Sequence, residues 1–115
     1  MKFTIERDRN ESEADAVAAF TAEGCNTLTV DFAAQTNGDH WHDFASRTCI
    51  VAGRLFLTDS DSGEEYELGP GTVIVAPPRV VHREVTDGYR AVIALDVDVS
   101  TLSQPILKDP ADLHA

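Results

Sequence analysis

The sequence has few of the residues on which several common functions depend. Its 115 residues include only two cysteines, Cys25 and Cys49, and neither belongs to a CxxC pair. This indicates packed thiols and not a disulfide framework or a redox motif. Nine Lys and Arg residues stand against 20 Asp and Glu residues, for a net charge of −11. Such a surface repels nucleic acid and anionic membranes, so we expect neither as a partner.

Long hydrophobic runs are also missing from the sequence. No apolar run approaches the roughly 20 residues that span a bilayer, and the N-terminal residues become charged too early for the apolar region of a signal peptide. We therefore expect a cytoplasmic protein. The sequence contains no GxSxG, P-loop, HExxH or dinucleotide-binding motif, so nothing supports nucleophilic serine catalysis or nucleotide-dependent chemistry.

What is present is a long series of short β signals. Hydrophobic residues make up 43% of the chain, which suits one domain with a real core. Strands are expected at about 27–32, 40–42, 47–52, 54–58, 64–68, 72–76, 80–86 and 89–97, with turns at 37–38, 53, 59–63, 69–71, 77–78 and 87–88. This spacing predicts an all-β sandwich or barrel. The tail over 100–115 contains two prolines and is predicted to be irregular.

One helix is predicted before these strands, at about 12–23. Ser12 is a suitable N-cap, and acidic residues follow it in the first turn. Gly24 is a natural stop. Val17 and Phe20 are spaced to share one face. We expect this helix to cover an open end or edge of the β structure.

Three of the four histidines have a spacing that suits a metal site. His40 and His42 flank Trp41, and in an extended strand the two imidazoles share one face while the indole lies on the other. His82 lies in a second extended segment, and His114 is predicted to be a bystander in the tail. Neutral imidazole is a common ligand of transition metals, and three imidazoles leave coordination positions open. A metal site and three unrelated histidines both remain open from spacing alone.

The residues around these histidines resemble the two motifs of the cupin superfamily. The matching positions are Gly38-Asp39-His40-Trp41-His42, Ser46 and Gly53 for the first motif, and Gly71, Pro77 and His82 for the second. The resemblance covers about 28–97. It implies a cupin fold, which is a jelly-roll-like double-stranded β-helix barrel, in one domain over 1–115 with the barrel at about 26–98. It also implies a metal inside the barrel mouth.

The chain departs from this family pattern at three positions. Ser46 stands where the family has a glutamate ligand, Arg79 stands at a glycine and Thr86 at an asparagine. Serine is a poor ligand for a divalent ion, so the affinity for metal should be lower than in a cupin with four protein ligands.

The resemblance therefore implies that His40, His42 and His82 hold a divalent transition metal, which can be Zn, Fe, Mn or Ni. Three alternatives stay open. Water can complete a three-histidine site. Glu84, which shares the strand parity of His82, can replace the missing carboxylate, whereas Asp39 has the opposite parity. In the third alternative there is no metal, and the histidines bind a ligand directly.

Four residues are candidate substrate contacts. Phe44 has the parity of the first two histidines and should line the barrel, as plain core or as a contact. Arg79 follows a Pro-Pro corner and can clamp a carboxylate or phosphate, unless it is a solvated loop arginine. Ser46 and Glu84 complete the set.

The resemblance leaves the reaction open. It implies either a metal-dependent enzyme of isomerase, lyase or dioxygenase type acting on a small polar carbonyl or carboxylate compound, or a non-catalytic module that binds or senses a sugar or a small acid. Catalytic residues beyond the ligands are not indicated. Cupins of this size are often homodimers, so we expect a homodimer. Trp41 is expected to point away from the histidines and to be exposed on the outside of the barrel. There it can pack under the helix or at the dimer interface.

Overall fold

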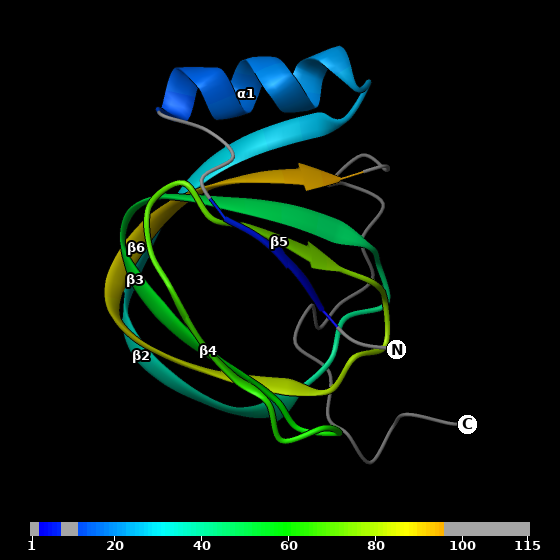
Figure 1. Cartoon of the computed structure of the whole chain (residues 1–115), viewed down its shortest axis with the longest axis vertical. Helices are drawn as coiled ribbons and strands as arrows, with labels where there is room; N and C mark the ends of the chain where they lie inside the picture. Colours follow the sequence, from blue (N-terminus) through cyan, green and yellow to red (C-terminus); the bar gives the residue numbers. More distant parts are fainter. Residues whose placement is uncertain (1–2, 8–11, 96–115) are drawn as a thin grey trace.

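The computed structural model describes residues 3–7 and 12–95, which form an all-β barrel with one helix outside it (Figure 1). The predicted irregular tail lies outside the described residues. The elements are β1 (Thr4–Glu6), α1 (Glu13–Ala22), β2 (Asn26–His40), β3 (Ser46–Asp59), β4 (Glu65–Leu68), β5 (Val73–Ala76) and β6 (His82–Leu95). The fold class expected from the sequence is therefore confirmed.

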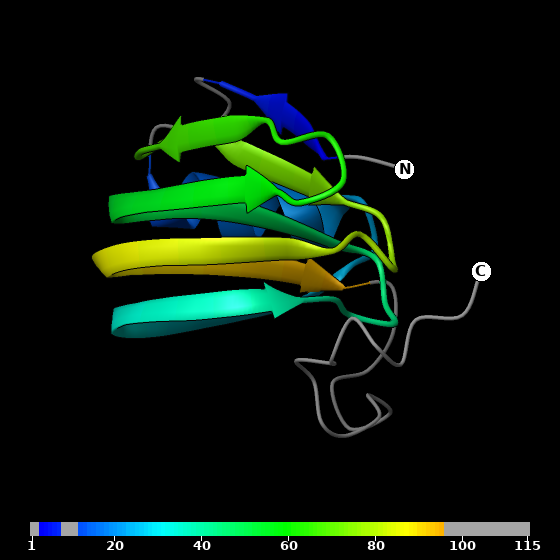
Figure 2. The ribbon, with the colours of Figure 1, turned by 90° about the horizontal axis from the view of Figure 1, so that it is seen from below.

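All strand pairs are antiparallel, in the order β1-β5-β3-β6-β2, with β4 pairing the second half of β3. The long strands lie side by side in Figure 2. Strand β6 is hydrogen-bonded along both edges, to β2 on one side and to β3 on the other. Side chains on β6 are therefore held by a strand that has a hydrogen-bonded neighbour on each side.

The long strands bend midway, where we predicted breaks. Gly53 was expected to separate two strands, and the pairs at 37–38 and 87–88 were expected to be turns. All three lie inside continuous strands, β3, β2 and β6 respectively. These predictions are wrong because each glycine permits a bend or bulge without reversing the chain. The pairing of β3 with β6 shifts on both sides of Gly53, and that of β2 with β6 shifts after Asn37.

Gly53 shows why glycine is needed at such a bend. Its φ is +82°, a conformation that other residues adopt only at a cost. A Cβ added there would lie 2.3 Å from the carbonyl oxygen of Gly88 on β6. The inward-facing side of β3 changes across this point, because Ile50 lies in the inner core before the bend and Leu55 and Leu57 lie there after it.

Helix α1 packs on the outer face of the barrel (Figure 1), and not over an open end or edge as predicted. Its buried Ala16 and Phe20 form a second core with Cys49 and Val92, whose side chains point out of the barrel. The predicted ends of the helix are confirmed. Ser12 Oγ accepts a hydrogen bond from the Asp15 amide at 3.1 Å, and the chain leaves the helix through Gly24, whose φ is +81°.

Two further expectations from the sequence concern the two cysteines and membrane-spanning segments. Within the described residues, Cys25 and Cys49 form no disulfide, as expected, and Cys49 is fully buried in the outer core. The described part of the chain contains no helix with the length and apolar character that crossing a membrane requires.

Strand β1, which we did not predict, pairs with β5 and carries Phe3 into the barrel.

Candidate metal centre

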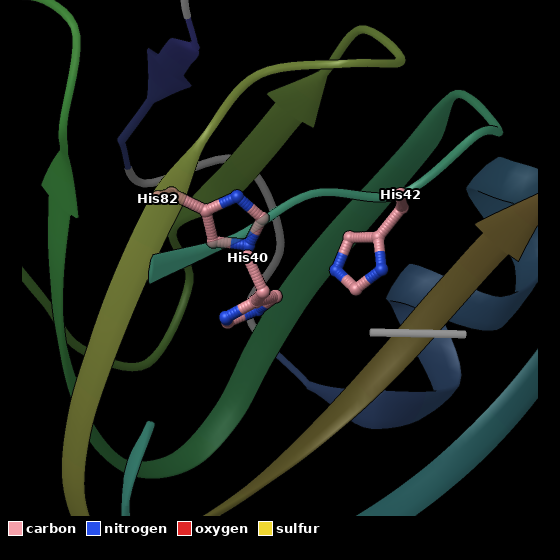
Figure 3. A group of neighbouring side chains, drawn as sticks. All are labelled: His40, His42 and His82. Carbon is pink, nitrogen blue, oxygen red and sulfur yellow. The ribbon is translucent and has the colours of Figure 1, made fainter. Parts of the chain in front are cut away.

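The fold brings the three candidate ligand histidines together (Figure 3). His40 ends β2 and His82 begins β6, and the two are cross-strand partners. His42 lies two residues beyond β2, so the prediction that the strand continues through it is wrong. One ring nitrogen from each histidine lies within 4.8 Å of the others. The ring centroids are 4.3 Å apart for His40 and His82, and 5.2 Å apart for the other two pairs.

Two of the rings are oriented by the backbone. His40 Nδ1 lies 2.8 Å from the carbonyl oxygen of Gly38, and His82 Nδ1 lies 2.8 Å from that of Val80. A carbonyl oxygen only accepts, so each Nδ1 must carry the proton and each Nε2 of the neutral ring must hold a lone pair. Such a second partner is the usual support of a metal-binding histidine. The donor set therefore fits a divalent transition metal.

His42 is anchored differently. Its carbonyl oxygen accepts a hydrogen bond from the Arg79 amide at 2.8 Å. The Arg79 side chain is exposed and does not line the cavity beside the histidines, so the predicted anion clamp gains no support from the cavity wall. Arg79 has a φ of +70°, which agrees with the glycine that the family pattern has at this position. Arg79 thus meets the site through its backbone.

Glu84 is the carboxylate next to the histidines. Its Oε1 lies 3.6 Å from His82 Nε2, and the side chain faces the cavity, as its parity predicted. Asp39 points elsewhere, accepting a hydrogen bond from Ser60 Oγ at 2.7 Å. The alternation of side chains therefore predicted correctly that Glu84 faces the cavity and that Asp39 does not.

Burial and the neighbouring charges together set the protonation states of His40 and Glu84. Burial lowers the pKa of His40, although its hydrogen bond to Gly38 and the nearby Glu84 oppose that change. Burial raises the pKa of Glu84, but the hydrogen bond and positive charge of His82 in its protonated form, with smaller contributions from His40 and His42, outweigh it, and the pKa ends below its ordinary value. Near neutral pH the site therefore combines a neutral His40 with an ionised Glu84.

The histidines open onto a cavity of about 440 Å³ inside the barrel. The predicted contacts Phe44, Ser46 and Glu84 all line it. Two aromatic side chains that we did not single out line it as well. Phe3 meets His82 edge to face at 5.2 Å, and Tyr89 stacks on Phe32 at 4.5 Å.

Sequence signals for these additional residues were weak. Phe3 directly precedes β1, a strand of three residues that is too short for a clear alternation. Tyr89 follows a glycine that resembles a turn. Trp41 was expected to be exposed but is buried, with 7% of its surface exposed, so it offers no exposed indole for a dimer interface.

Comparison with known proteins bears on the fold. No family model matches the chain, and no curated protein matches it. Solved structures do match the chain, among them the following two. A DUF861 family protein from Thermotoga maritima is 17% identical, with 82% of this chain and 99% of that chain covered at a TM-score of 0.60. The polyketide cyclase RemF from Streptomyces resistomycificus is 21% identical, with 78% and 69% covered at a TM-score of 0.52. Both are cupin-fold proteins, and the chain likewise has the fold of the cupin superfamily.

Proposed function

We propose that the chain is a metal-dependent enzyme of isomerase, lyase or dioxygenase type that acts on a small carbonyl compound, with His40, His42 and His82 as the metal ligands. The carrying observation is the convergence of three ring nitrogens within 4.8 Å. The backbone hydrogen bonds that leave Nε2 of His40 and His82 as the lone-pair nitrogen support it. A divalent transition metal held there supplies a Lewis acid that polarises a carbonyl oxygen.

Glu84 is the proposed proton acceptor of this site. Its carboxylate is buried, is ionised near neutral pH and lies 3.6 Å from His82 Nε2. A carboxylate beside a polarised carbonyl can remove a proton from the neighbouring carbon, hold it at a carboxylate oxygen and return it to another atom. Of the three arrangements that the sequence leaves open, we therefore favour the three-histidine site completed by water, with Glu84 outside the coordination sphere.

The alternative function is a non-catalytic module that binds a sugar or a small acid. The observation in its favour is Ser46, which lines the cavity wall where the family pattern has its fourth ligand. The fold serves enzymes such as the cyclase RemF, but a likeness of fold does not decide between catalysis and binding. A metabolite screen that detects both product formation and thermal shift separates the two functions, because a sensor gives the shift without a product.

Metal content tests the proposed ligands directly. The protein should be purified without a polyhistidine tag, and Zn, Fe, Mn and Ni should be measured per chain. We expect metal in the native protein and its loss in His42→Ala. His114→Ala is the control, because it removes the one histidine outside the proposed set. If the native protein carries no metal and gains no thermal stability from any of the four ions, the metal proposal is wrong.

The expected homodimer stays a prediction. The exposed large hydrophobic side chains of the described residues are Phe56 and Val85, with 48% and 47% of their surfaces exposed. They are cross-strand partners on β3 and β6. Light scattering coupled to size exclusion measures the oligomeric state in solution.

A further inference from the structure

The wall of the cavity is mainly apolar. Beyond the histidine cluster it is formed largely by aliphatic side chains from β2, β3, β5 and β6, among them Leu28, Val30, Leu55, Leu57, Ile74 and Ile93. The volume of about 440 Å³ falls within the range of about 300–1,000 Å³ that is usual for small-molecule sites. The space can hold a compact organic molecule, and most of that molecule would contact carbon atoms.

An aromatic pair stands at the bend of the barrel. Phe32 and Tyr89 are cross-strand partners on β2 and β6. Their rings stack at 4.5 Å with an angle of 17° between the planes, and both side chains line the cavity. The histidines of the same two strands lie at the strand ends, His40 at the end of β2 and His82 at the start of β6. A ligand can therefore contact an aromatic pair with one part and the histidines with another.

Positive side chains are missing from the wall. Among the residues that the structure describes, no Lys or Arg lines the cavity, and the one carboxylate that does is Glu84. The arginines of β3 and β6 are engaged elsewhere. Arg47 pairs with Glu23, Arg54 with Glu67, Arg83 with Asp39, and Arg90 with Glu13 and Asp31. An anion taken into this cavity would lose its water without gaining a side-chain cation, which is costly.

Tyr89 adds one neutral polar group to the wall. Its hydroxyl makes no hydrogen bond to any other part of the described chain, whereas Tyr66 bonds Glu64 at 2.8 Å. Burial raises the pKa of Tyr89 well above its ordinary value, with a smaller effect from Glu84, so the phenol remains a donor. A phenol that lines the cavity can donate a hydrogen bond to a ligand oxygen.

We infer that the cavity binds an uncharged aromatic molecule with an oxygen-bearing group, such as a ketone or a phenol. This inference rests on the proposed function in one respect, because the oxygen-bearing group is the one that the histidine site would act on. The class of ligand follows from the wall itself: apolar sides, a stacked aromatic pair and no cation. In the metal-free protein this wall disfavours the small acids that the sequence left open as substrates.

The test compares 2-naphthol with 2-naphthoate on the full chain after removal of metal by a chelator. The two probes share a ring system and differ in charge. We expect 2-naphthol to bind by calorimetry at least about tenfold more tightly than 2-naphthoate. Equal or tighter binding of 2-naphthoate, or binding of neither probe, overturns the inference. Because the protein is metal-free, this result is independent of whether the metal proposal holds.

Two variants locate the binding within the barrel. Val30→Trp fills the cavity and should weaken 2-naphthol binding by about tenfold or more. Val85→Trp places the same side chain on the outer face and should leave binding unchanged. Equal loss in both variants would contradict binding in the cavity. Circular dichroism establishes that both variants are folded.

A third variant reverses the charge preference. Thr48 lines the cavity, so Thr48→Lys adds the cation that the wall lacks, and Thr48→Met is its uncharged control of similar length. We expect 2-naphthoate to bind Thr48→Lys more tightly than it binds Thr48→Met. The absence of any gain would show that charge in the wall does not set the ligand class.

Discussion

His40 and His82 are direct cross-strand partners, and each holds its ring by a 2.8 Å contact from Nδ1 to the carbonyl oxygen two residues before it. The same local hydrogen bond therefore orients the histidine on each of the two strands. Backbone carbonyls are fixed by the sheet, so the tautomer and orientation of these rings do not depend on another side chain. The metal-free protein already presents two lone pairs to one point.

Metal is expected to leave the site as the pH falls below about 6, because a protonated imidazole cannot be a ligand. Burial lowers the pKa of His40 below its ordinary value, so protons compete weakly for its Nε2 at neutral pH. Competition grows as the pH falls below the ordinary histidine value of about 6.5. Dialysis over a pH series, with metal measured per chain, checks this. Retention at about pH 4 would argue against a histidine-only site.

Replacing Glu84 should separate proton transfer from metal binding. In Glu84→Gln the amide keeps the shape of the side chain but cannot take up a proton, so turnover of a substrate found in the metabolite screen should fall by roughly 100-fold or more. Metal content should be unchanged. Glu67→Gln is the control, since Glu67 is exposed and pairs with Arg54 outside the cavity. Loss of metal in Glu84→Gln would instead make Glu84 a ligand.

Gly53→Ala should strongly destabilise the barrel. The added Cβ would lie 2.3 Å from the Gly88 carbonyl oxygen, and backbone strain and overpacking together should cost about 3 kcal/mol or more. Gly63→Ala is the matched control. Gly63 also has a positive φ, of +77°, but nothing lies within 4 Å of its added Cβ, so the cost should be about 1 kcal/mol. Urea unfolding measures both free energies, and equal losses would contradict the close approach at Gly53.

Arg79→Gly and Arg79→Ala should differ in stability, although both remove the guanidinium group. The φ of +70° at this position costs alanine about 1 kcal/mol relative to glycine. We therefore expect Arg79→Gly to be the more stable variant in urea unfolding. Both variants keep the amide that bonds the His42 carbonyl, so both should keep their metal. Loss of metal in both would instead assign the Arg79 side chain a role at the site.

Side-chain parity predicted which side chains face the cavity better than turn signals predicted the strands. Glu84 faces the cavity and Asp39 does not, as the alternation along each segment required. Alternation is local and survives within each half of a bent strand. The residues around a glycine such as Gly53 do not distinguish a turn from a bulge. Only the pairing with β6 decides which one forms, and that pairing is not visible in a single sequence.

Contacts distant in sequence explain the remaining differences. Phe3 reaches His82 because β1 pairs with β5, and a strand of three residues gives too little pattern to predict that. The helix was predicted from its cap and its apolar face, but the surface it covers depends on Cys49 and Val92 pointing out of the barrel. Parity could not be carried across the bends, so the lining of the cavity was known only near the two motifs.

The hydrogen bond from the Arg79 amide to the His42 carbonyl offers a way to monitor the site through the exchange rate of one amide. It joins the connection between β2 and β3, which carries His42, to the connection between β5 and β6, which leads into His82. His42 is the one histidine of the three that no strand holds. An occupant that moves His42 should therefore change the hydrogen-exchange rate of the Arg79 amide, and this rate can be measured before any substrate is known.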